Sequence, residues 1–154
     1  MTRVTRGRGV TEEVKHESEE EILDRSLLLL ERDERQRELE RVNLVIDGAA
    51  SESGRSAVVG VQDTLEALNA RAVRDLVLVD DLRVEGVECQ ACSYLAATSL
   101  RSCPVCGAWM EPSSNIVERA VEQACLSDAN VDVVFGEARA QLLAKDGIGG
   151  LLRF

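Results

Sequence analysis

The chain has 154 residues, enough for one ordinary domain with additions, and 45% of them are hydrophobic while only 3% are aromatic. Its formal net charge is -10 at pH 7, and such a surface repels phosphate backbones, so nucleic-acid binding by this chain alone is disfavoured. No apolar run, such as residues 27–30, is longer than four residues, which is too short to span a bilayer, so the sequence predicts a cytoplasmic protein that does not enter membranes.

Residues 1–18 are polar and mixed in charge, and they show no hydrophobic periodicity, which predicts a disordered N-terminus. The single histidine, His16, has no candidate ligand partner nearby and is interpreted as a surface side chain. Residues 19–48 are rich in Glu, Leu and Arg, and pairs such as Glu31 and Arg35 follow helical spacing. They predict one long charged helix that is either exposed and docked only at its ends, or an interdomain connector whose first half, with residues 27–30, has lost or awaits a partner.

Residues 49–154 alternate short apolar runs with amphipathic stretches after a turn-forming break at 49–55. Such alternation predicts a three-layer α/β/α sandwich. The expected strands are residues 56–59, 75–80, 131–135 and 151–154, and the expected helices are residues 62–70, a segment after Asn115, and 137–145.

Three positions have expected local roles within this domain. Asn115 is the predicted N-cap of its helix, with Glu118 three residues on completing a capping box. Gly147 is the predicted C′ residue of the last helix. Cys125 is interpreted as a small core residue and not as a metal ligand.

Four other cysteines form two C-x-x-C pairs, Cys89 with Cys92 and Cys103 with Cys106, separated by ten residues. Each pair can place two thiolates on one ion, and two pairs complete the tetrahedral set that zinc prefers. We therefore predict a structural Zn²⁺ site in a ribbon over residues 86–112, inserted after the second strand. Four cysteine ligands leave no open coordination position, so no catalytic role is expected for the metal. Gly107 is expected to adopt a positive φ after the second pair.

Two other interpretations of the cysteines remain. Two disulfides would suit a secreted domain, but no signal peptide opens the sequence and a fifth cysteine would be left over. A thioredoxin-like redox pair would need a C-x-x-C at a helix N-terminus after a strand, whereas both pairs lie in a segment that contains Ser, Thr and Pro.

Two stretches of sequence point to a family. Gly60-Val-Gln-Asp-Thr-Leu-Glu-Ala-Leu68, continued by Ala72-Val73 and Leu76-Val-Leu-Val79, resembles the start of the C-terminal domain of archaeal and eukaryotic class-1 peptide chain release factors. The tail Asp146-Gly-Ile-Gly-Gly-Leu-Leu-Arg-Phe154 is similar to the end of that domain, and archaeal members carry a similar four-cysteine insertion. The resemblance covers residues 44–154, and Pelota-type ribosome rescue factors carry a related domain.

The resemblance implies a non-catalytic interaction domain that works in translation termination or ribosome rescue. Such a domain docks a translational GTPase and contacts the ribosome, and its fold is related to ribosomal proteins that bind kink-turn RNA. The acidic composition argues against RNA binding here. Neither the Gly-Gly-Gln nor the Asn-Ile-Lys-Ser motif of the other release-factor domains occurs in the chain, which leaves open that it is a fragment of a multidomain peptidyl-tRNA-hydrolysing factor.

The family pattern also leads to expectations about single positions. Ala70-Arg71 stands where the family has Met-Gly, so a left-handed Arg71 would cost ~1 kcal/mol. The expected partner contacts are the surface of the helix 62–70 and an exposed hairpin over residues 93–102, while the residues that bind a partner stay unidentified.

Overall fold

The computed structural model describes residues 18–51 and 55–153. Disorder was predicted for residues 1–18, and of these only Ser18 is among the described residues. The surface position predicted for His16 therefore also lies outside the described part of the chain. The chain divides into two compact units, Met1–Gln36 and Arg37–Phe154. No helix among the described residues is both long and apolar enough to cross a bilayer.

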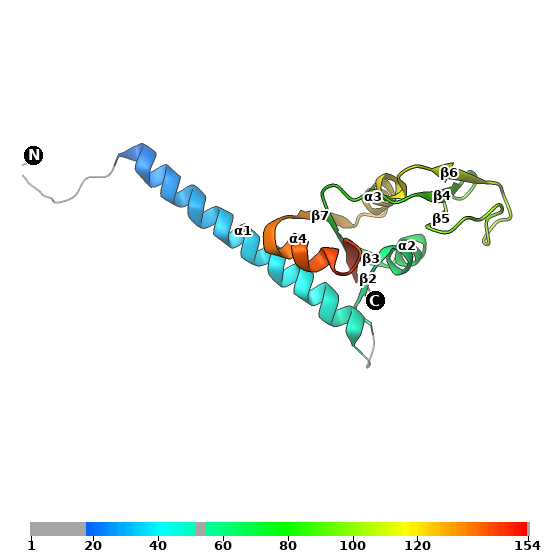
Figure 1. Ribbon diagram of the computed structural model, residues 1–154, viewed down its shortest axis with the longest axis horizontal. Helices are drawn as coiled ribbons and strands as arrows, with labels where there is room; N and C mark the ends of the chain where they lie inside the picture. Colours follow the sequence, from blue (N-terminus) through cyan, green and yellow to red (C-terminus); the bar gives the residue numbers. More distant parts are fainter. Residues whose placement is uncertain (1–17, 52–54, 154) are drawn as a thin grey trace, which may run out of the picture. The chain divides into compact units, whose positions relative to one another are not determined.

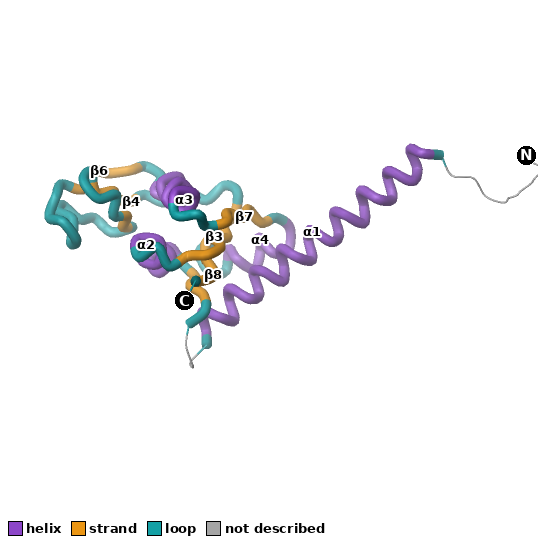
Figure 2. The backbone as a smooth tube through the Cα atoms, turned by 180° about the vertical axis from the view of Figure 1, so that it is seen from behind, coloured by secondary structure: helices purple, strands orange, loops and turns teal. Residues whose placement is uncertain are grey.

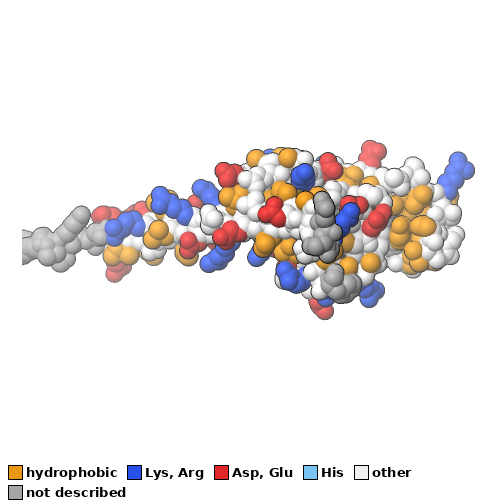
Figure 3. Space-filling view, turned by 90° about the horizontal axis from the view of Figure 1, so that it is seen from below, with side chains coloured by type: hydrophobic (Ala, Val, Ile, Leu, Met, Phe, Trp, Pro, Cys, Tyr) orange, Lys and Arg blue, Asp and Glu red, His pale blue; other side chains and the backbone are white. Residues whose placement is uncertain are grey.

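Helix α1 spans Glu19–Ala50, two residues beyond the predicted end. Within the first unit, residues 19–36 are exposed, and the predicted pair Glu31–Arg35 forms with the two charged groups 3.7 Å apart. Apolar, acidic and basic side chains are mixed on the surface of this segment (Figure 3). Within the second unit, Val42 and Val45 are fully buried. Within that unit, the C-terminal part of α1 is therefore docked.

The main sheet has four strands in the order β2-β8-β3-β7. β3 runs parallel to β7, and β8 lies between β2 and β3 and is antiparallel to both. Helices α2 and α3 cover one face, and α4 with the C-terminal part of α1 covers the other (Figures 1 and 2). This confirms the predicted three-layer α/β/α sandwich. The bounds are β2 Ala57–Val59, α2 Val61–Asn69, β3 Val73–Val79, α3 Ile116–Leu126, β7 Asn130–Val134, α4 Gly136–Leu143 and β8 Ile148–Leu152.

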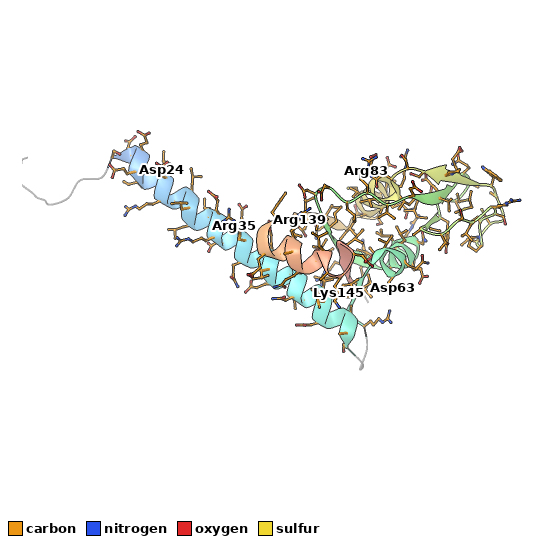
Figure 4. The ribbon with its side chains drawn as sticks, in the orientation of Figure 1. Asp24, Arg35, Asp63, Arg83, Arg139 and Lys145 are labelled. Atoms are coloured by element: carbon orange, nitrogen blue, oxygen red, sulfur yellow. The ribbon has the colours of Figure 1, made fainter. Side chains whose placement is uncertain are left out.

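Each face of the sheet has its own hydrophobic core, because successive side chains of a strand point to opposite faces. On one face, Leu76 and Leu78 of β3 pack with α2 and α3. On the other face, Val77 and Val79 pack with α1 and α4. Arg139 of α4 (Figure 4) also contacts the end of β3, with its guanidinium nitrogens 3.3 Å from Asp80 and 2.8 Å from Asp81.

The last strand differs from its prediction. β8 begins at Ile148, so Gly149 and Gly150 lie inside the strand and do not precede it. A Cβ atom at Gly149 would lie 2.8 Å from Val45 Cγ1 and 2.8 Å from the Val58 carbonyl oxygen. The two glycines therefore mark close packing of neighbouring elements, whereas the sequence prediction placed them before the strand.

Three local expectations need correction. Cys125 is exposed and is not a core residue, because it lies on the outer side of α3 beside the buried Ala124. Asn115 caps α3 as predicted, with its Oδ1 accepting from the Val117 amide at 3.2 Å, but its own amide donates to Ser113 Oγ and not to Glu118. After α4, the Gly147 amide bonds to the Leu142 carbonyl, which makes Asp146 the C′ residue, with φ 69°.

Arg71 retains the left-handed conformation that glycine has in the family pattern, with φ 56°. Glycine should relieve this strain, so we expect Arg71→Gly to raise the free energy of unfolding by ~1 kcal/mol. Part of this gain should be offset, because glycine increases the conformational entropy of the unfolded chain. Urea denaturation measures the difference. Arg71→Ala keeps the Cβ atom and serves as the control, and an equal gain in both variants would contradict the explanation.

Asp75 is a carboxylate within β3, with 8% of its surface exposed. Burial raises the pKa of this group, but hydrogen bonds from Arg74 Nε at 2.7 Å and Asn130 Nδ2 at 2.8 Å outweigh burial, so the net pKa is lowered. A lowered folded-state pKa means that the carboxylate stabilises the fold above its unfolded pKa, and this contribution is lost as the pH falls through the folded value.

We therefore expect the free energy of unfolding to fall below pH ~4, the range in which an unfolded-state aspartate titrates. Asp75→Asn should reduce this loss of stability at low pH and should lower the free energy of unfolding at neutral pH. Urea denaturation between pH 2 and 7 measures both effects. Asp63→Asn on the exposed side of α2 is the matched control (Figure 4). If the free energy of unfolding falls equally at low pH in Asp75→Asn and in the unmodified protein, Asp75 contributes nothing to the pH dependence.

Candidate metal centre

The four paired cysteines lie in a small second sheet with the order β5-β4-β6. Its strands are β4 Gly86–Cys89, β5 Leu95–Ala96 and β6 Met110–Ser113. Cys89 ends β4, and an isolated bridge between Ser102 and Trp109 holds the base of the loop that carries Cys103 and Cys106. Two turns, here called the first knuckle (residues 89–93) and the second knuckle (residues 103–107), thereby face each other.

The two knuckles have the same backbone hydrogen bonds. In each, the amide two residues after the first cysteine donates to that cysteine's Sγ at 3.3 Å. The amide four residues on donates to the carbonyl of the first cysteine, from Ser93 at 3.2 Å and from Gly107 at 2.9 Å. Ser93 and Gly107 also share a left-handed φ, of 66° and 79°. The positive φ predicted for Gly107 is confirmed, and Ser93 occupies the equivalent position without the freedom of glycine.

The four sulfur atoms converge on one point. Cys89 Sγ lies 3.4 Å from Cys106 Sγ, Cys92 Sγ lies 3.6 Å from Cys103 Sγ, and all four lie within 4.8 Å of one another. A tetrahedron with Zn–S bonds of ~2.3 Å has S···S edges of ~3.8 Å, so these distances suit a zinc ion. All four are free thiols, and so is Cys125, which is not a member of the cluster.

The electrostatics of the cluster divide the thiols into two kinds. An amide hydrogen bond from Cys92 is the main cause that lowers the pKa of Cys89, to about 6. The Tyr94 amide lowers the pKa of Cys92, but burial and the adjacent thiols raise it overall, to about 12. Burial raises the pKa of Cys103, yet amide hydrogen bonds from Cys106 and Val105 leave it lowered. The Ala108 amide lowers the pKa of Cys106, but the Cys89 thiol and burial together leave it raised. Four thiolates this close repel one another, so they suit a bound cation.

The ribbon is attached to the sandwich by contacts that sequence reasoning missed. Leu95 of β5 is 1% exposed and belongs to the core beneath α2 and α3. Asn69 at the end of α2 bonds both backbone groups of Leu95, accepting from its amide at 2.9 Å and donating to its carbonyl at 2.8 Å. The segment 93–102 is therefore not an exposed hairpin as expected, because its first half is docked.

Comparison with known proteins identifies the family of this chain. Residues 35–154 match the family model described as eRF1 domain 3. The chain belongs to the eRF1 domain 3 family. A solved structure described as the C-terminal domain of a peptide chain release factor from Methanosarcina mazei is similar to this eRF1 domain 3 chain, with 25% sequence identity and a TM-score of 0.57. The match covers 91% of this chain and 98% of that chain. No curated protein matches.

The comparisons confirm the family to which the sequence motifs pointed. The motif that opens at Gly60 covers nearly all of α2, and the tail motif contains β8, so the two motifs that carried the resemblance are adjacent in the fold. The Gly60 amide donates to the Ile148 carbonyl at 2.9 Å. These stretches are therefore structural parts of the eRF1 domain 3 fold.

Proposed function

We propose that this chain is a non-catalytic, zinc-stabilised interaction domain that acts in translation termination or ribosome rescue through a protein partner. The observation that carries the proposal is the match of residues 35–154 to eRF1 domain 3. The partner would be a translational GTPase together with the ribosome, and the site of action would be the cytoplasm. Within the chain, residues 19–48 would serve as a connector and residues 49–154 as the interaction domain, with the ribbon at 86–112 inserted in it.

The proposed zinc ligands are Cys89, Cys92, Cys103 and Cys106. Their support is the convergence of four sulfurs within 4.8 Å and the matching hydrogen bonds of the two knuckles. Thiolate ligands favour zinc over magnesium or calcium, which prefer oxygen. When bound, the metal would supply cross-linking of two turns and no chemistry on a substrate, because the protein ligands fill all four positions.

Binding to ribosomes tests the functional proposal most directly. The full chain is sedimented with purified ribosomes, alone and with a translational GTPase bound to a non-hydrolysable nucleotide. We expect co-sedimentation that increases with the GTPase and is lost in Cys103→Ser, while Cys125→Ser behaves as the unmodified protein. A chain that stays in the supernatant under every condition would refute the proposal.

The non-catalytic assignment has a separate test. Ribosomes carrying labelled peptidyl-tRNA are mixed with the chain, and release of the peptide is followed over time. We expect no release above the rate without protein, because the Gly-Gly-Gln motif that directs water in the family is not in this sequence. Release that scales with the concentration of the chain would assign it a hydrolytic activity instead.

A further inference from the structure

A groove with a volume of about 310 Å³ lies where the ribbon meets the sandwich. One wall is formed by the ends of α2 and α3, including Leu68 and Leu126, and the other by the two knuckles, including Val105, together with the adjacent Tyr94. Leu126 is 82% exposed and Val105 is 70% exposed. Two large apolar side chains therefore face water in one concave site, which is a common feature of protein–protein contact sites.

Hydrogen bonds connect the two walls of this groove. Gln123 of α3 donates from Nε2 to the Ser93 carbonyl, and Asn69 of α2 holds Leu95 through two hydrogen bonds. These bonds join α3 to the first knuckle and α2 to β5. The groove is thus pre-formed, which lowers the entropy cost of binding a ligand.

Arg71 lines the groove at its left-handed corner. Among the described residues, its guanidinium makes no hydrogen bond or ion pair. The two acidic residues of the groove are already engaged, because Arg119 lies 3.5 Å from Glu88 and 3.0 Å from Glu122. The groove therefore has apolar walls and two carboxylates that are already paired with Arg119. The Arg71 guanidinium is left without a carboxylate partner among the described residues.

We propose that this groove holds a segment of a partner protein that presents adjacent apolar side chains and one carboxylate, with the carboxylate bound to Arg71. The inference rests on the proposed function and names the surface through which a protein partner would be held. A second copy of this chain is disfavoured as the occupant, because each copy carries a net charge of -10 and the copies repel each other. The metal-bound knuckles would form one wall, so the groove depends on the ribbon.

The chemistry is tested with a minimal probe, N-acetyl-leucyl-leucine, which carries two apolar side chains and one carboxylate. The full chain labelled with ¹⁵N is titrated with this acid and, in parallel, with the corresponding C-terminal amide. We expect backbone shifts at Tyr94, Gln123 and Leu126, and about tenfold weaker binding of the amide, because a charge-assisted hydrogen bond is lost. Equal affinity of acid and amide, or shifts that map elsewhere, would overturn the proposal.

Two pairs of variants separate binding from folding. Arg71→Gly removes the cation without adding backbone strain and should weaken acid binding about tenfold, whereas Arg71→Lys should retain most of it. Leu126→Ser should weaken both acid and amide, and Leu44→Ser, at another site with 60% exposure, should weaken neither. If Arg71→Gly binds the acid as tightly as the unmodified protein, the role of Arg71 is wrong.

The same variants distinguish this inference from the functional proposal. Loss of ribosome or GTPase binding in Arg71→Gly and Leu126→Ser, with binding retained in Leu44→Ser, supports both. Undiminished binding in all three variants overturns the groove and leaves the functional proposal standing, and no binding even by the unmodified chain overturns the function. Sedimentation equilibrium gives the last check: self-association that Arg71→Gly abolishes would show that a second copy occupies the groove, contrary to the proposal.

Discussion

Removal of zinc is expected to unfold the ribbon and to destabilise the sandwich as well. The hydrophobic cluster inside the ribbon has only five buried members, and two of them are the proposed ligands Cys89 and Cys103. Structural zinc contributes on the order of 10 kcal/mol to the folding of small zinc domains, far more than so small a cluster can supply. Cys103→Ser, or chelation of the metal, should therefore disorder the ribbon.

The effect should extend to the main domain through Leu95, which is 1% exposed in the core beneath α2 and α3. Losing one buried leucine from a core costs ~2–5 kcal/mol, so the thermal midpoint of the sandwich should fall as well. Metal analysis should find one zinc per chain, and amide exchange before and after chelation should show β4, β5 and β6 opening first. Cys125→Ser is the matched control, because Cys125 is exposed and outside the cluster.

Two outcomes would count against this account. One is protein purified without any zinc that still shows protected amides in β4 and β6. The other is chelation that opens the ribbon and leaves the melting of the sandwich unchanged, which would mean that Leu95 and its bonds to Asn69 contribute nothing to the main core.

Gly149→Ala is expected to destabilise the sandwich by about 3 kcal/mol, because overpacking of a well-packed site costs 1–3 kcal/mol and more where backbone must move. The new methyl group would lie 2.8 Å from Val45 Cγ1 on α1 and 2.8 Å from the Val58 carbonyl oxygen on β2. Both distances are shorter than van der Waals contact, and the carbonyl belongs to a paired strand, so strand or helix has to shift. Urea denaturation measures the loss.

Two comparisons test whether packing is the cause. Gly150→Ala should cost less, because its nearest contact, the Asp75 carbonyl oxygen, lies at 3.0 Å. Val45→Ala combined with Gly149→Ala should restore only part of the stability, because the contact with the Val58 carbonyl remains. Gly149→Ala that unfolds at the same urea concentration as the unmodified protein would show that the strand accommodates the methyl group freely.

Patterns of local spacing were sufficient for the fold and for the cluster of four cysteines. The alternation of apolar runs and amphipathic stretches predicted the layers, because burial on a sheet face or a helix stripe leaves a period in the sequence. The four cysteines were identified for a similar reason, since two C-x-x-C pairs set the local turn geometry that brings thiols together. The positive φ of Gly107 was also predicted from residue type at a known turn position, whereas a left-handed Arg71 was considered only through the resemblance to the family.

Long-range packing decided the rest. The identity of Gly149 is explained by Val45 and Val58, which are about a hundred residues away in the chain, and no local pattern separates such a glycine from one in a turn. Cys125 falls next to the buried Ala124 on α3, and only the rotation of that helix against the sheet decides that Ala124 is buried and Cys125 exposed.

The sequence by itself thus determined the layered α/β architecture, the four clustered thiols and the family, because each depends on residues close together in the chain. The tertiary structure alone decided that Leu95 joins the main core, that Asn69 holds it there, and that Arg71 and Leu126 line one groove with the knuckles. The physical reason is that these contacts join segments about 25 to 55 residues apart, and their geometry follows from how helices and sheet pack, not from any residue's neighbours in sequence.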